Sequence, residues 1–523
     1  MEFHNLNDIE NATSRGRKEL LRFGSALLFI LMIVLFTSNL QTGSGVVSVE
    51  LVVAAIIGGY MALNIGANDV ANNVGPAVGS KALTLTGAII IAAIFESSGA
   101  LIAGGDVVST IKKGIIDPAL IGDSDTFIWL MMAALLAGAL WLNLATALGA
   151  PVSTTHSIVG GVLGAGIAAA GWSIANWDKM GAIAASWIIS PVIGGLIAAL
   201  FLIWIKRSIT YRDDMLIAAR KTLPLLIAIM VWAFSTYLIL KGLKKIWKVD
   251  FITALTIGLA FASLIYFTVR PMIARQAERL ENSKAGVNKL FTMPLIFAAA
   301  LLSFAHGAND VANAVGPLAA IHDAVQTQGV STKAEIPLWV MLIGAIGISL
   351  GLLLFGPKLI RTVGSEITEL DQMRAFSVAM AAAITVIIAS QLGLPVSSTH
   401  IAVGGVFGVG FLREYLKRTH AKTIQEIRDH HQGEDQQDVE AFIQRFESSS
   451  LAQKQELIAQ LKAKKADVEL SKQERKSLNK VYQKELVKRS AFLKIIAAWV
   501  ITVPASATMA AIIYYAIRGI MLP

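Results

Sequence analysis

The chain has 523 residues, of which 55% are hydrophobic and 15% are charged, and its formal net charge is +9. An apolar fraction this large excludes a soluble globular protein of this length and indicates a polytopic membrane protein. The chain contains no cysteine, which excludes disulfides and thiolate metal sites.

Apolar runs long enough to cross the hydrocarbon core of a bilayer, which is roughly 30 Å thick, recur along the chain. The first covers 23–36, and others cover 84–102, 128–148 and 183–205. A helix satisfies its own backbone hydrogen bonds in lipid, so these runs predict an all-α bundle with about 12 membrane segments. The tail before Phe23 lacks a small-residue cleavage site, and we therefore expect a retained first helix rather than a signal peptide.

Two motifs occur twice, in the same order. The first is Gly-Ala-Asn-Asp-Val-Ala-Asn-Asn-Val-Gly-Pro at 66–76, and it recurs at 307–317 with ten of its eleven positions unchanged. The second is Gly-Ala-Pro-Val-Ser-Thr-Thr-His at 149–156, and it recurs as Gly-Leu-Pro-Val-Ser-Ser-Thr-His at 393–400. This duplication predicts a membrane domain built from two related repeats.

The basic residues indicate how the helices are oriented rather than a nucleic-acid surface. Four of them lie between residues 15 and 22, so the positive-inside rule places the N-terminal tail in the cytoplasm. The basic loops 206–221 and 270–289 are separated by two helices, and both can lie inside. The chain then enters the first motif from outside and the second from inside, which predicts inverted repeats. The basic loop at 241–248 would be external, which counts against this assignment.

Residues 413–490 interrupt the apolar pattern with a mixture of Lys, Glu, Gln and Asp. We expect a cytoplasmic insertion with helical hairpin character, in which Ser471–Glu474 forms a capping box and Leu451, Leu457 and Leu461 form a thin apolar stripe. The predicted division of the chain is an N-terminal tail with an extra transmembrane helix (1–48), a first repeat (49–205), connecting loops and helices (206–292), a second repeat (293–412), the insertion (413–490) and a last transmembrane helix (491–523).

The first motif places carboxylates in apolar runs, where a charge is costly unless a partner replaces its hydration. Asp69 and Asp310 therefore need partners, and a bound Na⁺ held by carboxylate, carboxamide and backbone oxygens, or alternatively a proton, provides one. Glycine and proline flank each copy and favour a broken helix with free carbonyls. The predicted cation ligands are Asn68, Asp69, Asn72, Asn309, Asp310 and Asn313.

The second motif is typical of a helix start, because proline and consecutive hydroxyl residues suit the cap and the first turn. A helix N-terminus binds anions, and two such termini facing each other would hold one oxyanion. The apolar stretches that follow, 158–170 and 401–411, are short for a full crossing and indicate half-helices or re-entrant hairpins. The predicted anion ligands are Ser153, Thr154, Thr155, Ser397, Ser398 and Thr399.

Each feature also has a purely structural interpretation. A single Asn or Asp in a membrane helix is often an interhelical hydrogen-bonding group, and Ser-Thr-Thr after proline is often a plain cap. His156 and His400 are as typical of structural hydrogen bonding as of proton transfer. Glu96 makes the best single-residue case for function, because it stands alone within an apolar run. The duplication of both motifs with their spacing kept favours function.

These residues resemble the inorganic phosphate transporter (PiT) family, whose halves each carry a Gly-Ala-Asn-Asp-Val-Ala-Asn signature. The resemblance extends to Phe95-Glu96, to 110–117 and to 498–504, and it covers essentially the whole membrane domain. It implies a homodimeric symporter that moves inorganic phosphate across a bacterial inner membrane with Na⁺ or H⁺, without another cofactor or a nucleic-acid partner. The form of the motif is closer to the family's sodium-coupled members.

By position, the resemblance implies that phosphate lies between the hairpin hydroxyls and the Asn-Asp helices. It also implies cation ligation by Asp69, Asn72, Asp310 and Asn313, and a need for Glu96 in transport. The helix before Val49 and the insertion depart from the family's minimal pattern.

Three other functions fit some of these features. A sulfate permease of the same fold would use the same neutral donors. A membrane anion sensor would signal through the insertion, which carries no nucleotide or phosphotransfer motif. An enzyme is disfavoured, because no nucleophile has an adjacent base at readable spacing and no ATP-binding glycine-rich loop occurs.

Overall fold

The computed structural model describes residues 2–40, 47–150, 152–242, 249–329, 336–357, 359–360, 370–430, 436–448, 457 and 489–522. Within these ranges the chain is helical and has no strand, apart from one isolated bridge between Ile116 and Ala175, so the all-α prediction is confirmed. The α-helices are α1 (Glu2–Thr37), α2 (Val49–Asn68), α3 (Val70–Gly79), α4 (Leu85–Ala103), α5 (Gly105–Lys113), α6 (Ser124–Leu148), α7 (Thr154–Ala170), α8 (Trp177–Ile205), α9 (Met215–Gly242), α10 (Phe251–Ala277), α11 (Lys284–Asp310), α12 (Ala312–Thr327), α13 (Leu338–Phe355), α15 (Gln372–Gln391), α16 (Ser398–His430), α17 (Gln436–Ser448) and α20 (Arg489–Met521).

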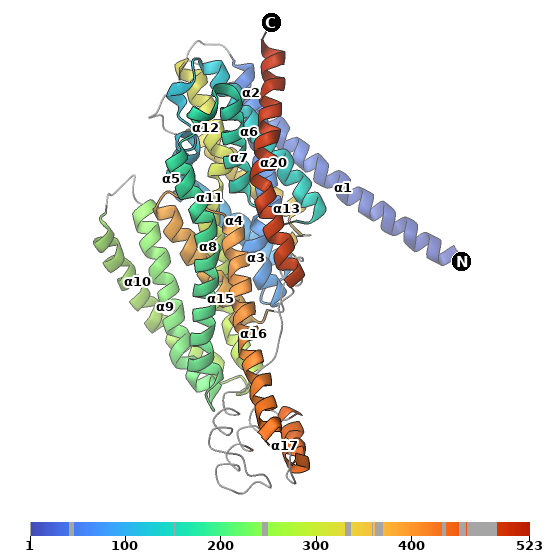
Figure 1. The fold of residues 1–523 in the computed structure, drawn as a ribbon, viewed down its shortest axis with the longest axis vertical. Helices are drawn as coiled ribbons and strands as arrows, with labels where there is room; N and C mark the ends of the chain where they lie inside the picture. Colours follow the sequence, from blue (N-terminus) through green and yellow to red (C-terminus); the bar gives the residue numbers. More distant parts are fainter. Residues whose placement is uncertain are drawn as a thin grey trace.

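The helices have the length and composition of a multi-pass membrane protein. Eleven segments within the described ranges are long and apolar enough to cross a bilayer, and the shorter apolar helix α7 adds to them. Large apolar side chains such as Ile188 and Leu196 on α8 and Leu264 on α10 are more than half exposed on the outer face, as lipid-facing positions are. The first apolar run lies in α1, which leaves the bundle at an angle (Figure 1) and packs on α2 and α13.

The two copies of the first motif lie on helices that run in opposite directions. In Figure 1, α2 lies near the top and α3 below it, whereas α11 lies below α12. The repeats also meet reciprocally, because Ser97 Oγ on α4 is 2.8 Å from Ser349 Oγ on α13. Ser97 donates to the carbonyl of Ala345 (3.3 Å) and Ser349 donates to the carbonyl of Ala93 (3.0 Å). These reciprocal bonds are consistent with a two-fold relation between inverted repeats.

Glycines of the first motif allow close helix packing at equivalent places in the two halves. A Cβ on Gly66 of α2 would collide with the carbonyl oxygen of Ile348 on α13. A Cβ on Gly307 of α11 would collide with the carbonyl oxygen of Glu96 on α4. The small residues therefore set the contacts α2–α13 and α4–α11.

Each hairpin turns at a glycine in the left-handed region. Gly149 ends α6 with φ +73°, and Gly393 follows α15 with φ +66°. After each turn the chain re-enters the bundle as α7 or α16. α7 is a short helix, but α16 continues from Ser398 to His430, beyond the half-helix that its apolar stretch suggested. The polar segment after Phe411 is rich in good helix formers, which explains the continuation.

The insertion is helical where the structure describes it. α16 reaches His430, α17 covers Gln436–Ser448, and Leu457 is buried. Ser471–Glu474, Leu451 and Leu461, together with the loop 243–248, lie outside the described residues.

Candidate functional site

The site lies where the motif helices of both repeats meet the two hairpin tips. The first motif places its polar residues around the α2–α3 and α11–α12 junctions, and the second places its hydroxyls at the first turns of α7 and α16. All of the predicted ligands and Glu96 are buried, with exposed fractions of 0 to 2%. We call the central side chains the carboxylate-hydroxyl cluster: Asp69, Asn72, Asp310, Asn313, Thr154, Thr155, Ser398 and Thr399.

Both hairpin helices begin with the same cap. Ser153 Oγ accepts a hydrogen bond from His156 N (3.1 Å), and Ser397 Oγ accepts one from His400 N (3.2 Å). The serines are therefore engaged in starting α7 and α16, as Ncap serines are. The next two residues of each hairpin carry the hydroxyls that reach the carboxylates.

Within each repeat, a hairpin hydroxyl donates to the motif carboxylate. Thr154 Oγ1 donates to Asp69 Oδ2 (2.6 Å), and Ser398 Oγ donates to Asp310 Oδ2 (3.1 Å). Thr154 and Ser398 hold equivalent places in the two copies of the hairpin motif. The repeats thus build the same contact twice.

Further hydrogen bonds cross between the repeats. Asn72 Nδ2 donates to Thr399 Oγ1 (2.9 Å), and Asn313 Nδ2 donates to Thr155 Oγ1 (3.2 Å). Thr399 Oγ1 also donates to Asp69 Oδ1 (3.1 Å). Each motif helix is therefore joined to the hairpin of the other repeat, and the cluster is complete only when both repeats are present.

Asn68 and Asn309 have a different role in this arrangement. Asn68 Nδ2 donates to Thr146 Oγ1 (2.9 Å), and its Oδ1 accepts from Val152 N (3.2 Å). In the orientation that satisfies both ends of its amide, Asn309 donates to the carbonyl of Val396 (3.1 Å) and accepts from Ser390 Oγ (3.1 Å). Both side chains fasten a hairpin to its motif helix, and their assignment as cation ligands stays a prediction.

The helix break in the first motif is small. The hydrogen-bond pattern is interrupted at Asp69, but its backbone stays right-handed, with φ −84° and ψ −40°. The Asp69 carbonyl accepts from both the backbone N (3.0 Å) and Nδ2 (3.1 Å) of Asn72. The second motif breaks similarly at Val311. These small breaks leave fewer backbone carbonyls free to bind a cation than an unwound segment would.

The carboxamide oxygens of Asn72 and Asn313 have no hydrogen-bond partner in the described part of the chain. Both atoms are buried, and they occupy equivalent places in the two repeats. A buried acceptor without a partner is costly and uncommon. Together with two carboxylates, these oxygens form a set of hard ligands suited to an alkali cation or a proton.

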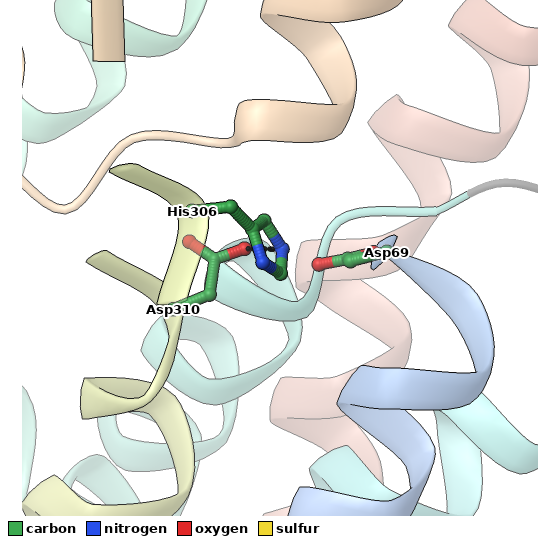
Figure 2. A group of neighbouring side chains, drawn as sticks. All are labelled: Asp69, His306 and Asp310. Atoms are coloured by element: carbon green, nitrogen blue, oxygen red, sulfur yellow. Dashed lines mark ion pairs between the residues drawn. The ribbon is translucent and has the colours of Figure 1, made fainter. Parts of the chain in front are cut away.

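His306 is a site residue that the sequence analysis missed. Its Nδ1 lies 2.6 Å from Glu96 Oε2 and its Nε2 lies 2.8 Å from Asp310 Oδ2. Figure 2 shows the ring between Asp310 and Asp69, and ligand atoms of these three residues all lie within 4.8 Å of one another. Asn73 Nδ2 donates to the other oxygen of Glu96 (2.9 Å). Glu96 is thereby connected to the carboxylate-hydroxyl cluster through His306.

This connection is made at only one of the two equivalent contacts between the repeats. His306 precedes Asp310 by four residues, and the equivalent residue before Asp69 is Ile65. Glu96 opposes Gly307 as Ile348 opposes Gly66, so Glu96 and His306 at the α4–α11 contact correspond to Ile348 and Ile65 at the α2–α13 contact. The spacing of four residues places His306 and Asp310 on one helical face and is the signal that could have revealed the histidine.

His156 and His400 lie on the other side of the hairpins. Their rings are 4.4 Å apart, and His400 stacks on Trp499 at 3.7 Å. Both line an apolar cavity of about 920 Å³ between α8, α16 and α20. The aromatic packing favours the structural interpretation of these histidines.

Comparison with known proteins covers nearly the whole chain. Residues 65–510 match the model of the phosphate transporter family. A Helicobacter pylori J99 protein named "Putative phosphate permease" is 53% identical over 532 residues, which are 99% of each chain. A similarly named Pyrococcus abyssi protein is 39% identical over 364 residues, which are 69% of this chain and 89% of the relative.

A comparison with solved structures agrees with these matches. The chain is similar to one described as "The sodium-dependent phosphate transporter", with a TM-score of 0.74 and 32% sequence identity. The match covers 91% of this chain and all of the other.

Proposed function

The chain belongs to the phosphate transporter family, and on that basis we propose that it is a symporter which carries inorganic phosphate across the cytoplasmic membrane together with Na⁺ or H⁺. Members of this family are permeases rather than enzymes. The observation that carries the coupling is the hydrogen bonding of hairpin hydroxyls to the two motif carboxylates.

A hydroxyl group has a single proton to donate. Thr154 and Thr399 donate their hydroxyl protons to Asp69, and Ser398 donates its hydroxyl proton to Asp310. When a cation or a proton occupies the carboxylates, these hydroxyls become free to donate to an oxyanion beside them. Cation binding thereby creates the donors that phosphate needs.

Charge supports the same coupling. Phosphate cannot enter a buried pocket beside Asp69 and Asp310 while both are ionised, because like charges repel strongly at low dielectric. Positive charge brought in with phosphate removes this penalty. The buried oxygens of Asn72 and Asn313 add neutral ligands for such a cation, and the N-termini of α7 and α16 add partial positive charge for the anion.

Two observations bear on which cation is used. The structural neighbour is described as sodium-dependent, which supports Na⁺. The chain of contacts Glu96–His306–Asp310 supports H⁺, because an imidazole between two carboxylates can pass a proton from one to the other. Sodium is the first choice, since the hard oxygen ligands of the carboxylate-hydroxyl cluster outnumber the one imidazole beside it.

The test is uptake of labelled phosphate by purified protein in liposomes. We expect uptake against a phosphate gradient when an inward Na⁺ or H⁺ gradient is imposed, and equal uptake without either gradient would contradict coupling. Counterflow against sulfate, repeated in sodium-free buffer, separates a phosphate from a sulfate permease and Na⁺ from H⁺. The mass of the protein in detergent tests the homodimer that the family resemblance implies.

A further inference from the structure

The two ring nitrogens of His306 lie in different surroundings. Nδ1 is 2.6 Å from Glu96 Oε2, and Asn73 Nδ2 donates to the other oxygen of the same carboxylate (2.9 Å). Nε2 is 2.8 Å from Asp310 Oδ2, and the ring stands between Asp310 and Asp69 (Figure 2). Glu96 therefore holds one edge of the imidazole, and the other edge faces the two motif carboxylates.

The contact between Nε2 and Asp310 is short, but it lacks the alignment of a hydrogen bond. Although the two atoms are 2.8 Å apart, Nε2 has no hydrogen-bond partner within the described ranges. The side chain of His306 is completely buried. A buried nitrogen in this condition is uncommon, and a ligand bonded to Nε2 would satisfy it.

Three potential metal ligands converge at this point. His306 and Asp310 are four residues apart on α11, so they share one helical face, and Asp69 comes from the end of α2 in the other repeat. One ligand atom from each lies within 4.8 Å of the others. Bonds from a zinc ion to nitrogen or oxygen are about 2.0–2.2 Å long, so two ligand atoms of one ion lie at most about 4.4 Å apart. A movement of roughly half an ångström brings all three atoms into range of one ion.

Glu96 occupies the place of a supporting group for a metal-binding histidine. A histidine that binds a metal through one nitrogen usually donates the N–H of the other nitrogen to a carboxylate. That hydrogen bond fixes the tautomer and the ring orientation, and it makes the bonding nitrogen more basic. Glu96 Oε2 is placed to accept it from Nδ1 of His306, which leaves the lone pair of Nε2 for a metal.

This support is built at only one of the two equivalent contacts between the repeats. The first motif differs between its copies at one position, which is Asn73 in the first copy and Ala314 in the second. The α2–α13 contact has isoleucine in place of both His306 and Glu96. The residues that distinguish the two contacts are thus the same ones that orient Nε2, and we expect one metal site in each chain.

We propose that Asp69, His306 and Asp310 bind a divalent first-row transition-metal ion, with Zn²⁺ as the preferred ion. Imidazole nitrogen suits such ions, whereas hard cations take oxygen ligands. A dication also balances the charges of two carboxylates. The unpartnered carboxamide oxygens of Asn72 and Asn313 are further neutral donors in the same cluster.

The proposal extends the proposed function, because the metal would occupy the carboxylates that we assign to the coupling cation. It rests on that function only for the identity of the competing ion. An ion bound to Asp69 and to α11 would join the motif helices of both repeats. A transition metal would therefore compete with Na⁺ or H⁺ for the cluster.

The first experiment is a titration of the purified full chain with Co²⁺, which replaces Zn²⁺ and absorbs visible light when it is bound by protein ligands. The protein is held in phosphatidylcholine nanodiscs in sodium-free choline buffer. We expect one Co²⁺ per chain that Zn²⁺ displaces, and His306→Gln should weaken this binding by about 100-fold or more. The control is His322→Gln, which removes a histidine packed on Trp339 outside the cluster and should leave binding unchanged.

A second variant tests Glu96 as a positioning residue. Glu96→Gln keeps an oxygen that can accept from Nδ1 but removes the charge that makes Nε2 more basic. It should weaken Co²⁺ binding by about 10-fold to 100-fold while the stoichiometry and the visible spectrum stay those of the unmodified chain. Loss of the spectrum at saturating Co²⁺ would show that Glu96 is itself a ligand and would overturn the assignment of its role.

Asp69→Asn covers the case in which His306→Gln does not fold. This substitution lies on the other repeat, keeps an acceptor for Thr154 and should weaken Co²⁺ binding by about tenfold or more. The proposal is overturned if the unmodified chain binds no Co²⁺, or if the folded variants at positions 69 and 306 bind it as tightly as the unmodified chain.

Exchange of choline for Na⁺ at equal ionic strength separates this proposal from the proposed function. We expect Na⁺ to weaken Co²⁺ binding, because both ions use the motif carboxylates. Binding that depends on His306 but not on Na⁺ would support the metal site and would count against sodium as the coupling ion. The titration needs no transport, so a failure of coupled uptake would not affect its result.

Discussion

Nδ1 of His306 lies 2.6 Å from Oε2 of Glu96, and both side chains are completely buried. The contact joins α4 to α11, 210 positions apart in sequence. At the equivalent contact, between α2 and α13, the corresponding residues are Ile65 and Ile348. One of the two equivalent contacts between the repeats therefore carries a polar connection to the carboxylate-hydroxyl cluster that the other contact lacks.

This difference predicts a non-additive effect of substitution. Glu96→Ile or His306→Ile alone leaves a buried polar partner uncompensated and should cost on the order of 3 kcal/mol of stability. The double variant copies the residues at the equivalent α2–α13 contact, Ile65 and Ile348, and should regain most of that loss without regaining uptake. Thermal unfolding in detergent and liposome uptake are the two measurements. A double variant no more stable than the singles would contradict the equivalence of the two pairs.

The motif carboxylates should determine the cation dependence of uptake. Asp69→Asn and Asp310→Asn keep an acceptor for the hairpin hydroxyl but remove the charge that holds a cation. We expect initial uptake to fall by about 100-fold, as loss of about 3 kcal/mol of binding free energy implies. Asp178→Asn, an exposed position at the start of α8, is the control and should transport normally. A variant at Asp69 or Asp310 that kept normal dependence on Na⁺ and H⁺ would refute the ligand assignment.

The hairpin hydroxyls should affect phosphate affinity. Thr155→Val and Thr399→Val are nearly isosteric and each removes a hydrogen-bonding group from the cluster. Loss of one bond to a charged ligand corresponds to roughly 1.5–3 kcal/mol, so the KM for phosphate should rise by about 10-fold to 100-fold. Thr508→Val removes an exposed hydroxyl that bonds only within its own helix, and it should leave the KM unchanged. Unchanged affinity in both hairpin variants would indicate that these residues only cap or pack.

Close packing at the first motif should be intolerant of a methyl group. Gly66→Ala and Gly307→Ala place a Cβ against a carbonyl of the neighbouring helix, and each should cost about 1–3 kcal/mol as the helices move apart. Gly181→Ala on α8 has open space at its Cβ and should be neutral or slightly stabilising. The measurement is the midpoint temperature of thermal unfolding of the three variants in one detergent. Equal midpoints would show that the α2–α13 and α4–α11 contacts adjust to the added methyl group without cost.

The features that could be predicted from sequence are those that are local or duplicated. Two copies of Gly-Ala-Asn-Asp and of the Ser/Thr hairpin predicted the repeats, and the uncommon carboxylates in apolar runs predicted that Asp69 and Asp310 belong to a buried site. Proline and the consecutive hydroxyls predicted the starts of α7 and α16, and the structure adds that Gly149 and Gly393 adopt the left-handed backbone in the turns before them.

The features that were missed depend on partners far apart in the chain. His306 reads as one more residue of an apolar helix until the fold brings Glu96 to it. The crossed bonds Asn72–Thr399 and Asn313–Thr155 need both repeats in place. The length of α16 was underestimated, since hydropathy marks where the membrane ends and not where a helix ends.

The crossed bonds between the halves also limit how such a molecule can arise. A precursor chain with one repeat would contain an Asn-Asp helix and a hairpin. Its hairpin would lack an asparagine donor of the kind that Asn72 provides to Thr399. Two identical precursors could complete each other only if one were inserted upside down relative to its mate. A gene fusion that fixes the two orientations in one polypeptide would leave the copies free to differ, as Glu96 and His306 differ from Ile348 and Ile65.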